Sequence, residues 1–144
     1  MAALTTDRKY KIRAGGSNRV ETYKIAAATT IFNGALVAFN AAGYIVPASD
    51  TAALTVVGIA QSRVVNTGAA GDKEVTVMTS MRTNLNNAGG AITIAALGKP
   101  VYAADDNSVT TAAVATNDLL VGVCDCIDSD GVWVFIDLAI NATA

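Results

Sequence analysis

Glycines recur at matched positions in two separate stretches of this 144-residue chain. The stretch that begins Gly34-Ala35-Leu36-Val37 ends at Val57-Gly58-Ile59, and the one that begins Gly98-Lys99-Pro100-Val101 ends at Val121-Gly122-Val123. The two glycines are 24 residues apart in both stretches, and the second stretch follows the first at an offset of 64 residues. Each stretch has the pattern of a strand, a turn, a short strand, a loop and a further strand. The pattern predicts a duplicated β unit at about residues 31–60 and 95–124.

The composition favours closely packed strands. Ala, Thr, Val and Gly predominate, and only 15% of the residues are charged. Short apolar runs bounded by Gly, Asn, Asp and Pro predict strands near residues 20–26, 36–40, 43–47, 55–64, 74–80, 100–103, 120–127 and 131–138. A short helix near residues 50–54 or 112–117 is the only helical alternative. We expect residues 20–144 to form a single all-β domain, either a β-sandwich or a partly closed β-barrel, of jelly-roll-like or tulip-like topology.

The aspartates predict turns. Asp130-Gly131 is the clearest hairpin signal in the chain. The segment 128–131 resembles the start of a calcium loop, but it lacks the later oxygen ligands. Asp105 and Asp106 point to opposite sides of an extended chain, which is a poor geometry for sharing a proton. We therefore expect both to be turn residues that face water.

Histidine is absent from the chain, and only two cysteines occur. Hydrolytic triads, haem ligation and zinc sites lose most of their support without histidine. Cys124 and Cys126 lie two residues apart on one predicted strand, where disulfide geometry is rarely satisfied. We expect two small buried thiols, no metal, no cofactor and no enzymatic activity. No window approaches the 18 apolar residues that cross a bilayer, and no secretory pattern is present, so we expect cytoplasmic synthesis and no membrane partner.

Basic residues are concentrated near the amino terminus. Residues 1–24 hold six of the ten basic groups and two acids, a net charge of +4, and the remaining residues carry −6. This predicts a flexible, extended basic arm at residues 1–19, with a glycine-rich hinge at 14–18. The candidate contacts to an acidic neighbouring protein are Arg8, Lys9, Lys11 and Arg13. A solvated end without a partner is the alternative.

The charges of this arm are too dilute for a nucleic-acid site. We expect that deletion of residues 1–18 leaves the domain folded and weakens its attachment to a partner protein.

The final predicted strand is apolar on both faces. Four aliphatic side chains between Val132 and Leu138 share one face, and Trp133 and Phe135 share the other. A central position in the core explains this pattern, and so does a second face covered by another subunit. Trp133 and Phe135 are therefore candidates for an oligomer interface.

Four segments of the chain resemble the small capsid decoration, or cement, proteins of tailed bacteriophages. They are Gly34–Val37, Val56–Ala60, Glu74–Val77 and Val132–Ile136. The shared pattern is a Gly-x-x-Val strand, an alanine-rich loop, a Val-Gly-Ile strand and a closing aromatic strand, and it covers roughly residues 20–138. The basic arm and the larger body of this chain depart from that pattern.

The resemblance implies a structural role and no enzymatic activity. Members of the family bind the outside of the expanded icosahedral head as dimers or trimers, and they hold capsomers together against the internal DNA pressure. The implied partners are the major capsid protein and further copies of the same chain, and the implied location is the outer capsid surface after synthesis in the host cytoplasm. A tail or fibre component is the alternative, and a carbohydrate-binding β domain is a weaker one because no row of aromatic residues is present.

Overall fold

The structure is a computed structural model that describes residues 3–13 and 16–142. Its strands are β1 Ile12–Arg13, β2 Val20–Lys24, β3 Thr29–Ile31, β4 Leu36–Phe39, β5 Ile45–Pro47, β6 Thr55–Ala60, β7 Val64–Asn66, β8 Glu74–Met78, β9 Ser80–Asn87, β10 Pro100–Ala103, β11 Ser108–Thr110, β12 Leu120–Asp128 and β13 Gly131–Asp137. The helices are short: two 3-10 turns, η1 Ala88–Gly90 and η2 Ile94–Ala96, and one α-helix, α1 Leu138–Asn141.

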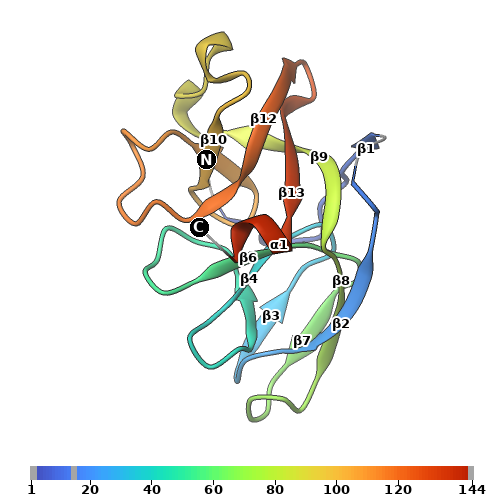
Figure 1. The fold of residues 1–144 in the computed structure, drawn as a ribbon. Helices are drawn as coiled ribbons and strands as arrows, with labels where there is room; N and C mark the ends of the chain where they lie inside the picture. The colour runs from blue at the N-terminus through green and yellow to red at the C-terminus, as the bar shows by residue number, and fades with distance from the viewer. Residues whose placement is uncertain (1–2, 14–15, 143–144) are drawn as a thin grey trace.

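The strands form two units, one above the other in Figure 1. In the second unit the order is β9-β11-β10-β12-β13, and pairing of β13 with β9 closes this sheet into a five-stranded barrel. In the first unit the order is β2-β8-β6-β4-β5, and its two edges meet at a parallel bridge between Ile25 and Ile45. The predicted all-β class is confirmed, in the form of barrels.

The two units repeat the same strand pairing. Val37 lies opposite Gly58 in the first unit, and Val101 lies opposite Gly122 in the second. The register shifts directly after Val37 and directly after Val101. The two glycines therefore occupy one structural position in two copies of the unit.

The repetition extends to the strands outside the glycine pattern. Strand β9 corresponds to β2, and β13 corresponds to β8. The pair Leu85 and Val132 in the second unit matches the pair Tyr23 and Val75 in the first. Strand β13 also joins β12 as β8 joins β6. Apart from Ser80, strand β9 lies outside the predicted strands, although its pairing with β13 closes the second barrel.

The interiors of the two units match position by position. The six matched pairs, all buried, are Val37 and Val101, Ile45 and Val109, Val57 and Val121, Ala60 and Cys124, Val75 and Val132, and Val77 and Val134. The outer side of the first unit is also buried, because four of its residues join the hydrophobic core of the second unit: Leu36, Ala38, Val56 and Ile59. The core of the second unit therefore extends onto the outer side of the first unit, whereas the interior of the first unit forms a separate cluster.

Helix α1 fastens the two units together. The side-chain amide of Asn141 donates to the carbonyl of Val56 at 3.3 Å and to that of Val121 at 2.9 Å. Asp137 accepts a hydrogen bond from the N–H of Ala139 at 2.9 Å and so caps the start of the helix.

Two local predictions are wrong. Residues 50–54 and 112–117 are not helical, because the Asp50 carboxylate accepts hydrogen bonds from the N–H groups of Thr116 and Asn117, both at 2.8 Å, which hold the two segments as turns. Asp106 does not face water: its side chain is 3% exposed and accepts a hydrogen bond from the N–H of Leu4 at 2.8 Å. Burial raises the pKa of Asp106 above its ordinary value.

Candidate contact surfaces

The N-terminal segment is packed along both units. Arg8 donates from Nε to the carbonyl of Gly34 in the first unit and from Nη1 to the carbonyl of Asn84 in the second, both at 2.8 Å. Burial lowers the pKa of Arg8 to about 10. Further along, β1 pairs with β9, with Ile12 opposite Thr83.

This packing differs from the predicted arm, which was expected to extend away from the domain. The physical reason is that the acidic domain itself supplies the acceptors for the basic segment. Two residues of the predicted hinge, Ala14 and Gly15, lie outside the described residues.

Three of the four predicted contact residues are paired within the chain. Arg8 is held as described above, Lys11 pairs with Asp130 at 2.9 Å, and Arg13 pairs with Asp128 at 2.8 Å. Lys9 is exposed. Lys11 and Arg13 thus link the N-terminal segment to the second unit, and Arg8 links it to both units. A contact of the four basic residues with another protein stays a prediction.

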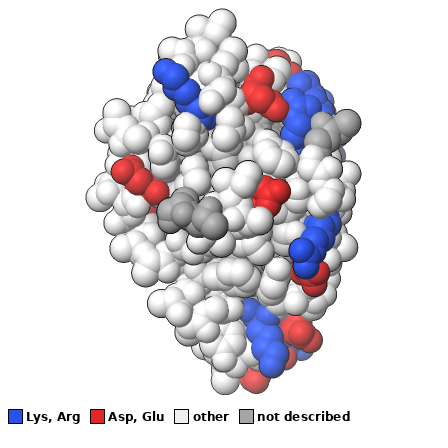
Figure 2. Space-filling model, viewed as in Figure 1, with Lys and Arg blue, Asp and Glu red and all other residues white. Residues whose placement is uncertain are grey.

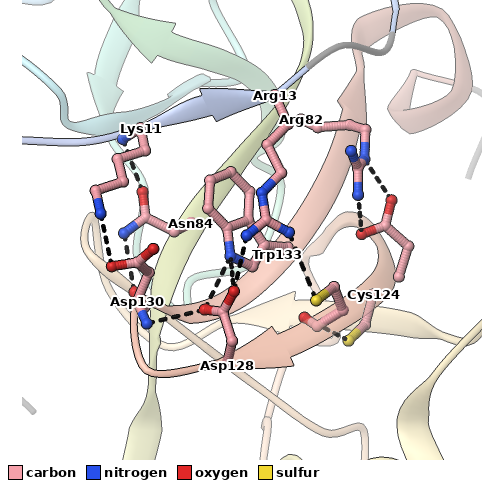
Figure 3. Close-up of polar contacts among 10 residues, drawn as sticks. Lys11, Arg13, Arg82, Asn84, Cys124, Asp128, Asp130 and Trp133 are labelled. Atoms are coloured by element: carbon pink, nitrogen blue, oxygen red, sulfur yellow. Dashed lines mark hydrogen bonds and ion pairs between the residues drawn. The ribbon is translucent and has the colours of Figure 1, made fainter.

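Trp133 lies beneath this segment, as Figure 3 shows. Its side chain is 1% exposed, and the guanidinium of Arg13 lies 3.8 Å from the ring centroid. The indole N–H donates to the two carboxylate oxygens of Asp128 at 3.0 and 3.1 Å. Trp133 therefore contacts its own N-terminal segment, and this burial contradicts the expectation that it faces another subunit.

Hydrogen bonds also lower the pKa of Asp128. The N–H of Asp130 donates to its carboxylate at 2.8 Å within the β12–β13 hairpin. This bond has the largest effect, and together with the bonds from Trp133 and Arg13 it holds the pKa of Asp128 below its ordinary value, although desolvation opposes them. Asp128 therefore acts as a structural acceptor.

The two cysteines differ in environment. Cys124 is buried inside the second barrel, and burial raises the pKa of its thiol. Cys126 is partly exposed, and Arg13 Nη1 donates to its sulfur at 3.6 Å. The prediction of two buried thiols therefore holds for Cys124 alone.

We expect a bulky maleimide to label one thiol of the native protein and two in denaturant. The partly exposed Cys126 should react first, because the reagent needs access to the thiolate. Mass spectrometry of the labelled peptides checks this, with Cys126→Ser as the control that should remain unlabelled in the native state. Equal labelling of Cys124 and Cys126 in the native protein would contradict the difference in burial.

The second unit has a partly exposed apolar face, which we define by Pro100, Leu120, Val123, Phe135 and Ile140. These side chains come from β10, β12, β13 and α1, and they surround a hollow of about 130 Å³ above Gly122. Figure 2, viewed as in Figure 1, shows charged side chains mainly along the right and lower edges of the molecule, with an acidic side chain near the middle of this side. Phe135, predicted at an interface, lies on this face and is partly buried.

Two alanine-rich loops adjoin the apolar face. They comprise residues 91–97 and 111–115, and with Tyr102 they line a hollow of about 400 Å³ that meets the apolar face at Pro100. Ile94 and Val114 in these loops expose 78% and 62% of their surface. The second unit therefore presents two adjoining apolar surfaces.

Within residues 3–13 and 16–142, no group of three or more Cys, Asp or Glu side chains is placed to hold a metal ion. The part of the chain that the structure describes also contains no helix long and apolar enough to cross a membrane. No protein-family model, curated protein or solved structure shows significant similarity to the chain.

Proposed function

We propose that this protein is a capsid decoration, or cement, protein of a tailed bacteriophage. It binds the exterior of the expanded icosahedral head and stabilises contacts between capsomers of the major capsid protein. The observation that carries the proposal is the pair of adjoining apolar surfaces on the second unit, displayed on a body whose two units are joined by a hydrophobic cluster. The resemblance of the four strand segments to such proteins supports it.

The physical requirements of a cement protein match this arrangement. It needs a rigid body, a surface for the shell and a surface for other copies of itself. Exposed apolar surfaces of this kind mark protein contacts. Modest contacts are sufficient, because an oligomer engages several capsid subunits at once and its effective concentration is high. The role requires no active site, no nucleic-acid contact and no membrane.

We assign the shell contact to the alanine-rich loops. Ile94 and Val114 protrude there, and the basic side chains that could have supplied a contact are mostly paired within the chain. A contact made by apolar side chains should depend little on salt, whereas one made by the basic segment would weaken as salt rises.

We expect the purified protein to sediment with expanded heads of the cognate phage and not with unexpanded heads. Ile94→Asp should weaken this binding about tenfold, because a charge replaces a protruding apolar contact. Val65→Asp is the matched control, since Val65 is 47% exposed on β7 of the first unit. Binding to neither type of head would contradict the proposal, and binding to purified tails would favour the tail component.

A further inference from the structure

We propose that the open edge of strand β2 in the first unit binds an extended, uncharged segment of another protein, which adds to the sheet as one further antiparallel strand. This inference goes beyond the proposed function, because it concerns the other unit of the molecule and holds whichever protein supplies the segment. Its test uses the isolated protein and a peptide, so the two can fail separately.

The first argument is the direction of the backbone groups of β2. This strand lies at the margin of its sheet, as Figure 1 shows, and β8 is its only partner among the strands of the described residues. In the same register, the N–H of Ile25 donates to the carbonyl of Lys73 at 2.9 Å. Because such bonds involve every second residue of an antiparallel strand, Val20 and Thr22 direct their N–H and carbonyl groups away from β8. No residue within 3–13 and 16–142 bonds to these groups, so the edge is open.

The second argument is that the equivalent edge in the second unit is occupied. In the match of β9 with β2, Arg82 corresponds to Val20, and Asn84 corresponds to Thr22. Strand β9 has β13 on one side, and on its other side the extended strand β1 pairs with Arg82. The carbonyl of Asn84 accepts a hydrogen bond from Arg8 of the same N-terminal segment at 2.8 Å. One unit thus has an extended segment along this edge, and the other leaves the same position open.

The third argument is charge, which indicates the chemistry of the partner segment. Arg19 forms a salt bridge with Glu21 at 2.7 Å, and Lys24 lies opposite Glu74 in the β2–β8 pair. The charges along this edge are therefore already matched within the chain, and a charged segment would gain little from them. Val20 exposes 49% of its surface to the solvent. A segment of uncharged, β-branched residues suits such an edge, because these side chains pack well across neighbouring strands.

A hollow beside β2 can receive the side chains of the added strand. Its volume is about 300 Å³, and its lining includes Tyr23, Ser80, Asp137 and Leu138. The Asp137 carboxylate is already engaged as the cap of α1, so the hollow offers mainly hydroxyl and apolar groups to a partner. Every second residue of an added strand lies on the same face as Tyr23. Threonine or valine at these positions matches the lining.

An NMR titration of the isotope-labelled full chain with the capped peptide Gly-Ser-Thr-Val-Thr-Val-Thr-Ser-Gly tests the edge. We expect the amide signals of Val20 and Thr22 to shift with a dissociation constant of about 1 mM, and their hydrogen exchange to slow. Glu21 and Tyr23, which bond to β8, should exchange slowly with and without the peptide. The same peptide, N-methylated at its five central residues, keeps the side chains but donates no hydrogen bonds there. It should bind about tenfold more weakly or not at all.

A matched pair of variants at one position tests the edge from the side of the protein. Thr22→Pro removes the outward N–H but none of the donors to β8, and it should weaken peptide binding about tenfold. Thr22→Val keeps the N–H and should bind the peptide as the wild-type protein does. Urea unfolding shows whether both variants are folded, and the methylated peptide keeps the test valid if the proline variant is not.

Three outcomes would overturn the inference. The first is that the amides of Val20 and Thr22 do not shift at millimolar peptide, and the second is that the methylated peptide binds equally well. The third is that the same amides shift with protein concentration in the absence of peptide, which would mean that a second copy covers the edge. If the peptide binds at β2 but the protein binds no heads, the proposed function fails and the inference stands. The reverse result leaves the proposed function alone standing.

Discussion

Gly58→Ala and Gly122→Ala are each expected to lower the free energy of unfolding by about 3 kcal/mol. A Cβ atom at Gly58 would lie 1.9 Å from the carbonyl oxygen of Met78, and one at Gly122 would lie 2.0 Å from that of Phe135. Both obstacles are backbone atoms of the neighbouring strand, which cannot move without breaking the sheet. Because the two glycines occupy one structural position in the two units, the two losses should be similar.

Gly43→Ala is the control for this pair. Gly43 has a φ of 87°, so alanine is strained there, but the added Cβ would meet no atom within 4 Å. We expect this substitution to cost about 1 kcal/mol. Urea unfolding of the three variants gives the comparison. Equal losses at Gly43, Gly58 and Gly122 would show that the close approach of the strands does not require the two glycines.

Deletion of residues 1–13 is expected to lower the free energy of unfolding by about 4 kcal/mol. The deletion uncovers Trp133, removes β1 from the edge of β9 and removes the hydrogen bonds that Arg8 makes to both units. The charge pattern of the sequence predicted the opposite: deletion of the N-terminal arm was expected to leave the domain folded. Urea unfolding, together with a red shift of the tryptophan fluorescence of the folded protein, is the measurement.

Single substitutions separate the parts of this effect. Arg13→Ala should cause a smaller loss than the deletion, because it removes only the side chain over the indole ring. Lys9→Ala should change nothing, since Lys9 is exposed. A truncated protein that unfolds at the same urea concentration as the full chain would refute the account of the N-terminal segment.

Local patterns predicted much of the barrel framework. The spacing of the glycines marks the matched positions of Gly58 and Gly122, and Asp130-Gly131 marks the β12–β13 hairpin. Strand β9 was not predicted, because polar residues occupy its outward positions and one of its buried positions is the polar Thr83. An alternation of this kind carries little hydrophobic signal, so only the pairing with β13 reveals the strand.

Long-range pairing accounts for the other differences. The sequence shows a basic segment and an acidic domain, but not that Asp128 and Asp130 lie beside Arg13 and Lys11. For the same reason it does not show that Trp133 is covered from within the chain. The apolar face could have been predicted from the sequence. Val56 and Ile59 of the first stretch correspond to Leu120 and Val123 at the same offset as the glycines. The duplication alone therefore indicates a second apolar side.

Image reconstruction of expanded heads saturated with this protein is the most direct test of the proposed attachment. We predict added density on the outer surface at a copy number fixed by the icosahedral symmetry, with the alanine-rich loops against the shell. Expanded heads of the cognate phage that show no added density at saturating protein concentration would contradict the account.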